Sequence, residues 1–148
     1  MTSDKNSSFP VFPMPMRGVL LLCGMYTFAI GAFFRYFGKD LIKWLSMNAA
    51  FSTEISSNTL GSIGMVLGFL IFLSAFYPIS WNYLILVGIL GKITLATWFV
   101  IGFMPELDWN KRTIFHLVFN ELIWLIPLGF IFFRSIKVKK YLDSIKDN

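Results

Sequence analysis

Long runs of apolar residues alternate with short polar segments along the chain. Four of these runs approach the roughly 20 residues that an α-helix needs to cross the hydrocarbon core of a bilayer. They cover about 18–37, 60–77, 83–104 and 113–133. The strands of a membrane β-barrel would be shorter and would alternate apolar with polar residues. The pattern therefore predicts an all-α membrane protein, a single domain over residues 1–148 with four transmembrane helices.

Two of the connections between these runs are very short, which indicates how the helices are arranged. The links are PISWN at 78–82 and PELDWNKR at 105–112. Helices joined by so few residues pack side by side and point in opposite directions. We therefore expect an antiparallel four-helix bundle.

The segments outside the apolar runs predict three further features. Residues 1–16 contain three prolines within six residues, and we expect no regular helix there. The stretch KDLIKWLSM, between the first two spans, predicts a short amphipathic helix at the membrane interface. Its apolar face would carry Leu41, Trp44, Leu45 and Met47. The basic tail at 134–148 is expected to continue the last helix into water.

Composition and charge support a membrane location and suggest an orientation. The chain is 56% hydrophobic and 14% charged, against roughly 25% charged residues in soluble domains. The net charge is +5, and seven Lys and Arg residues flank the spans on the side of the termini, against five on the other side. Because such residues favour the cytoplasmic side, both termini are predicted to be cytoplasmic. The lipid bilayer is then the main partner, and no basic patch on a soluble domain suggests nucleic acid.

Small residues in the second and third spans predict close contacts between helices. Such residues let the backbones of two helices approach each other. The candidates are Gly61, Gly64, Gly68, Gly88 and Gly91. They would pack inside the bundle or, alternatively, against another subunit or a second copy of the chain.

The stretch FHLVFNELIWLIP at 115–127 places polar side chains within the last apolar run. Ionisable side chains inside membrane spans are rare, and they usually face the protein interior and pair with one another. The candidate buried polar cluster comprises Lys92, His116, Asn120, Glu121 and Trp124. Thr94 and Thr97 of the third span are expected to add hydroxyl groups to it.

Helix geometry predicts an ion pair within this cluster. Lys92 lies about 18 Å from the end of its span and Glu121 about 12 Å from the start of the next, at about 1.5 Å per residue. The remaining gap of about 6 Å is within reach of a lysine side chain that extends along its helix. Pro127 lacks a backbone N–H, so we expect a kink at that residue.

This residue set leaves several functions open. One His, one Glu and no thiolate cluster form a poor ligand set, so neither a metal site nor another cofactor is predicted. His116 with Glu121 could transfer protons, and a desolvated Lys92 could act as a base or nucleophile in an enzyme or a small-molecule binder. Proton conduction is a further alternative. The cluster could instead be structural and fix the register of the helices.

The four-span layout, Arg17-Gly18 at the first span, and LVGILGK in the third resemble DoxX-like small four-helix bacterial inner-membrane proteins. The segment FNELIWLIP is similar to an Asn-Asp/Glu-Leu-Ile-Trp stretch in proteins of that type. The resemblance implies a four-helix fold in a bacterial inner membrane and a link to membrane oxidoreductase systems. The leading hypothesis is an accessory or scaffold subunit of a larger membrane complex. An intramembrane enzyme, a lipid or small-molecule binder, and a proton conductor are the alternatives.

Overall fold

A computed structural model of the protein describes residues 10–147, and all regular structure within this range is helical. The elements follow in the order α1 (Met14–Tyr36), α2 (Gly38–Ser46), α3 (Asn58–Ser74), α4 (Asn82–Gly102), α5 (Met104–Leu107), α6 (Lys111–Phe115), the π-helix η1 (His116–Leu122) and α7 (Leu125–Lys146). The prediction of an all-helical protein is confirmed for the described residues.

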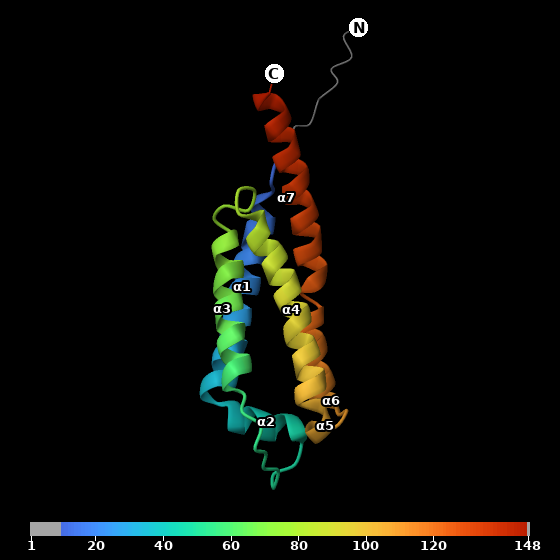
Figure 1. The fold of residues 1–148 in the computed structure, drawn as a ribbon. Helices are drawn as coiled ribbons and strands as arrows, with labels where there is room; N and C mark the ends of the chain where they lie inside the picture. Colours follow the sequence, from blue (N-terminus) through green and yellow to red (C-terminus); the bar gives the residue numbers. More distant parts are fainter. Residues whose placement is uncertain (1–9, 148) are drawn as a thin grey trace.

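Figure 1 shows that the long helices lie along one common direction. α1 runs towards the lower end of the view, α3 returns upwards, α4 runs down again, and η1 with α7 returns. α2 lies across the lower end, and α7 extends beyond the other helices at the upper end. α1 packs on α3, α3 on α4, and α4 on η1 and α7.

Three helical stretches are long and apolar enough to cross a membrane. These are α1, α4 and the continuous helical stretch Lys111–Lys146. α3 is equally apolar but has 17 residues, and it ends at Ser74 rather than near residue 77 as expected. Large apolar side chains are exposed on the outer faces of all these helices, as is typical where lipid replaces water. These features indicate a membrane protein.

Glycines bring α1 and α3 into backbone contact. A Cβ added at Gly68 would meet the backbone of Phe28 and Gly24, and one added at Gly31 would meet the backbone of Met65 and Gly64. A side chain at these positions would therefore force the two helices apart.

The glycines of α4 serve a different purpose. A Cβ at Gly88 would meet the side chain of Ile71, and one at Gly91 would meet the side chain of Leu67. These two glycines leave room for large apolar side chains of α3, whereas those between α1 and α3 leave room for backbone.

The amphipathic helix predicted after the first span is present as α2, and two of its apolar side chains are buried in the protein. Ile42 and Leu45 are buried, whereas Trp44 is 47% exposed and Met47 is 54% exposed. Met47 ends the helix in the left-handed conformation, with φ 59°. Ile42, which was not assigned to the apolar face, therefore packs on the protein, whereas Trp44 and Met47 lie on the outer surface and their contact with lipid stays a prediction.

Two residues before η1 attach α2 to the end of the bundle. The Asn110 side chain donates to the carbonyl of Leu45 at 2.8 Å. Arg112 donates to the carbonyl of Trp44 at 2.7 Å, and its guanidinium lies 4.7 Å from the Trp44 ring centroid. Trp44 thus contributes to this contact through its exposed ring rather than through burial.

The expectation that no regular helix forms within residues 1–16 is wrong for its last three residues. α1 begins at Met14, and Pro15 lies in its first turn. Proline is tolerated there because the first N–H groups of a helix have no intrahelical partner. Residues 1–9 lie outside the described part of the chain.

Candidate functional site

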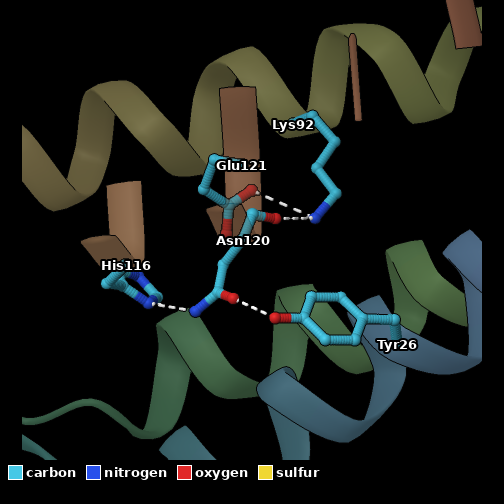
Figure 2. A network of polar contacts seen from close by, with 5 residues as sticks. All are labelled: Tyr26, Lys92, His116, Asn120 and Glu121. Atoms are coloured by element: carbon cyan, nitrogen blue, oxygen red, sulfur yellow. Dashed lines mark hydrogen bonds and ion pairs between the residues drawn. The ribbon is translucent and has the colours of Figure 1, made fainter. Parts of the chain in front are cut away.

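Lys92 and Glu121 form an ion pair between α4 and η1, as the helix arithmetic predicted. The Lys92 ammonium lies 3.3 Å from Oε2 of Glu121. It also donates a hydrogen bond of 2.5 Å to the backbone carbonyl of Asn120. Both charged side chains are buried, and Lys92 is only 1% exposed. Figure 2 shows the Lys92 side chain reaching from its helix to the Glu121 carboxylate and the Asn120 carbonyl.

The two contacts of the ammonium differ in kind. Glu121 Oε2 is within ion-pair distance but has no partner in hydrogen-bond geometry. The directed bond of Lys92 goes to the Asn120 carbonyl instead. Lys92 is therefore held by an electrostatic attraction to one residue and by a hydrogen bond to the backbone of its neighbour.

The π-helical segment η1 explains how two consecutive residues can both be interior. Upstream, the buried positions are Thr113, His116 and Asn120, spaced as on one face of an α-helix. Downstream, the buried row contains Glu121, Leu128, Ile131, Ser135 and Val138. Compared with a continuation of the first row along an α-helix, the second row is displaced by one residue towards the C-terminus. The wider turn of a π-helix takes up this extra residue, so Asn120 and Glu121 both face inwards.

The helix deformation was expected at Pro127, but it lies further upstream. The π-helix covers His116–Leu122, and the Ile123 N–H donates to the carbonyl of Val118 at 2.8 Å, five residues back. Pro127 itself lies in the first turn of α7, where its missing N–H costs little. The proline therefore follows a new helix start and does not bend a continuous helix.

A second polar row runs from η1 to α1. The Tyr26 hydroxyl donates to Oδ1 of Asn120, whose Nδ2 lies 2.6 Å from Nδ1 of His116. With its oxygen used by Tyr26, the amide donates through its nitrogen, so His116 accepts at Nδ1. The imidazole also lies against two rings, 4.4 Å from Phe99 and 5.1 Å from Phe34. Figure 2 shows that this row joins the ion pair at Asn120.

Asn120 is consequently the residue that connects the two polar groups. Its side chain binds Tyr26 and His116, and its backbone carbonyl accepts from Lys92. Tyr26 is absent from the sequence-based prediction, because nothing in an apolar span indicates which of its aromatic residues will face a helix far along the chain.

The remaining predicted members lie at the edge of the cluster or outside it. The Trp124 ring packs on Tyr26 with a centroid separation of 5.4 Å, but its buried indole nitrogen has no hydrogen-bond partner within the described part of the chain. Thr94 and Thr97 are exposed, and their hydroxyls donate to the carbonyls of Leu90 and Ile93. The prediction that these threonines join the cluster is wrong, because each satisfies its hydroxyl on its own helix.

Little space adjoins the ion pair. A cavity of about 10 Å³ is bounded by Thr27, Lys92 and Glu121, among others, and the buried Thr27 hydroxyl has no described hydrogen-bond partner. This volume corresponds to about one water molecule. A substrate would not fit beside Lys92 without movement of the helices.

A larger groove opens on the outer face next to Trp124. It has a volume of about 430 Å³ and is bounded by apolar side chains of η1 and α7 together with Tyr26 of α1. Of the residues of the polar cluster and its Tyr26 contact, only Tyr26 and Trp124 line this groove. Over residues 10–147, no group of three or more His, Cys, Asp and Glu residues could hold a metal ion.

Comparison with known proteins identified no matching family model, no matching curated protein and no matching solved structure. The resemblance to DoxX-like proteins therefore stays a prediction.

Proposed function

We propose that the protein is a non-catalytic accessory or scaffold subunit of a larger membrane assembly. The observation that carries this proposal is the closure of the polar cluster. Lys92 is 1% exposed and is held by an ion pair and a hydrogen bond, and the adjoining cavity has a volume of only about 10 Å³. Such an arrangement is better suited to fixing two helices against each other than to admitting a substrate.

The proposal includes four spans that form an antiparallel bundle. α3 has 17 residues, which is near the lower limit for crossing a bilayer. Its glycine contacts with α1 support a shared membrane depth for the two helices. The excess of Lys and Arg beside the termini supports cytoplasmic termini, and the resemblance of FNELIWLIP to DoxX-like proteins favours a bacterial inner membrane.

The far end of α7 supports the presence of a partner subunit. The helical stretch Lys111–Lys146 has 36 residues, or about 54 Å at about 1.5 Å per residue, against a hydrocarbon core of about 30 Å. α7 projects beyond the other helices (Figure 1), and its exposed end carries Leu142 and Ile145, three residues apart on one face. An apolar stripe on a helix outside the bundle is a typical contact for another protein.

Site-specific photo-crosslinking in native membranes tests this function. We expect a crosslinker at Ile145 to give one product of defined mass, and Leu142→Asp to abolish it. A crosslinker at Lys140, which is exposed on the opposite face of α7, provides the control, since it should give no such product. A protein that remains monomeric in mild detergent and gives no crosslink at Ile145 would contradict the proposal. A membrane oxidoreductase system is the first assembly to examine, given the resemblance noted above.

The groove beside Trp124 favours binding of a lipid or another apolar small molecule as a second candidate function. Its volume of about 430 Å³ is within the usual range for ligand sites. The groove differs from the pocket expected at the polar cluster, because Trp124 lines it but Lys92, His116, Asn120 and Glu121 do not. A brominated acyl chain in this groove should quench Trp124 fluorescence more than that of Trp44, and equal quenching would argue against a bound ligand.

Proton conduction and acid–base catalysis receive less support from this arrangement. The Asn120 amide separates Tyr26 from His116, and an amide does not readily pass on a proton as a hydroxyl or imidazole does. Lys92 and Glu121 are engaged with each other, away from the outer groove.

A further inference from the structure

A polar cavity opens at the end of the bundle where α1, α2 and α3 meet. Its volume is about 640 Å³, the size of a small-molecule site. Its walls include two cations and two anions from three different segments, together with the first residue of α3. These residues are Arg35, Lys39, Asp40, Glu54 and Asn58. The cavity is thus polar and charged, unlike the apolar groove beside Trp124.

The charges around this cavity do not neutralise one another. Lys92–Glu121 is the only ion pair among the described residues, so none of the four charged groups is within 4.0 Å of an opposite charge. Arg35 donates to the Ser62 hydroxyl. Unpaired positive and negative groups around one cavity are complementary to a zwitterionic ligand, which carries both a positive and a negative charge. An anionic ligand would be repelled by Asp40 and Glu54, and a cationic ligand by Arg35 and Lys39.

Some of the groups that line the cavity suit the negative part of such a ligand. The N-terminus of α3 has no side-chain cap from Ser57 and no acidic residue in its first turn, although the Asn58 N–H donates to the Ser56 hydroxyl at 3.4 Å. Helix N-termini favour anions, and phosphate in particular, because their first N–H groups lack intrahelical partners. Arg35 and Lys39 supply positive charge to the same cavity. A phosphodiester would find complementary charge at these groups, and an ammonium group would find it at Asp40 and Glu54.

The floor of the cavity is firmly packed. The buried Ser57 hydroxyl donates to the Phe34 carbonyl at 2.7 Å, which attaches the loop before α3 to α1. Gly38 permits this packing, because a Cβ at that position would collide with the Ser57 hydroxyl. These contacts between α1, α2 and the loop before α3 therefore determine the shape of the cavity.

The surroundings of the cavity favour a lipid over a free metabolite. Tyr36 and Phe37 line it and are 68% and 58% exposed. Exposed aromatic residues beside an amphipathic helix that lies across the span ends are typical of the membrane interface. A primary ammonium can donate three hydrogen bonds to carboxylates, whereas a quaternary ammonium can donate none.

We propose that this cavity binds the headgroup of a zwitterionic phospholipid with a primary amine. Arg35, Lys39 and the α3 N-terminus hold the phosphodiester, and Asp40 and Glu54 hold the ammonium. The site requires the membrane location given above, but it does not depend on the accessory function.

Lipid retention by the full-length protein tests this site. The protein is placed in nanodiscs with equal amounts of phosphatidylethanolamine, phosphatidylcholine and phosphatidylglycerol of identical acyl chains, and the retained lipids are measured by native mass spectrometry. We expect phosphatidylethanolamine to be retained about tenfold over the others, the effect of one charge-assisted hydrogen bond. Lys39→Gln/Glu54→Gln should abolish the preference. Both residues are exposed, so an unchanged melting temperature should accompany the loss.

A matched control distinguishes the cavity from general interfacial charge. Lys111→Gln/Asp108→Asn also removes one cation and one acid, outside the cavity, and should keep the preference. Equal retention of all three lipids, or equal loss in both double variants, would overturn the proposal. Soluble glycerophosphoethanolamine should not displace the lipid at equal concentration. Complete displacement would overturn the assignment to a lipid and identify a free zwitterion as the ligand. Neither result bears on the crosslink at Ile145, so this proposal and the accessory function can fail separately.

Discussion

The α1–α3 interface and the α4–η1 interface hold helices together by different means. Between α1 and α3, glycines such as Gly31 and Gly68 allow backbone to lie against backbone. Between α4 and η1, a buried ammonium meets a carboxylate and a backbone carbonyl. In lipid, little hydrophobic force brings helices together, so close packing and polar contacts must provide the attraction. The first interface depends on the absence of side chains, and the second depends on the pairing of two long ones.

The largest effect is expected from breaking the polar interface on one side only. Lys92→Met leaves the Glu121 carboxylate buried without a countercharge, and the free energy of unfolding should fall by about 3–5 kcal/mol. Lys92→Met/Glu121→Leu removes both charges and should recover most of that loss. Reversible unfolding in mixed micelles measures both variants. A double variant as unstable as the single one would show that the ion pair is not what holds this interface.

The glycine interface should respond according to what each added methyl group meets. Gly68→Ala meets backbone and should cost about 3 kcal/mol, the upper end for overpacking, whereas Gly91→Ala meets the Leu67 side chain, which can rotate, and should cost about 1 kcal/mol. Gly129→Ala, with nothing within 4 Å, is the control and should be neutral or slightly stabilising. The same unfolding measurement ranks the three variants. An equal cost for Gly68 and Gly91 would remove the distinction between the two kinds of glycine contact.

A smaller effect than that of Gly68→Ala is expected where the polar cluster touches α1. Tyr26→Phe deletes the hydroxyl that donates to Asn120 and should cost about 1–2 kcal/mol. Thr94→Val is the matched control, because its exposed hydroxyl bonds only to its own helix and should change stability by less than about 0.5 kcal/mol. Equal values for the two variants would indicate that Tyr26 does not join α1 to the cluster.

The features that depend on spacing along single helices could be predicted from the sequence. Apolar runs gave the helices, and the rise per residue placed Lys92 opposite Glu121. The features that depend on how each helix is oriented about its own axis could not be predicted from the sequence. Tyr26 contacts Asn120 across 94 positions, and no pattern in either span specifies that pairing. Likewise, Thr94 was assigned to the cluster from polarity alone, whereas its hydroxyl bonds to its own helix.

The π-helix has a consequence for how this chain could vary in length. Because η1 accommodates one residue more than an α-helix would, a single deletion within 117–119 would leave an unbroken α-helical stretch from Lys111 onwards. That helix would still be apolar and long enough to cross a membrane. It could present only one of Asn120 and Glu121 to the interior, so either the row to Tyr26 or the ion pair to Lys92 would be lost. The number of residues in this segment, as much as their identity, therefore determines whether the two polar groups can coexist.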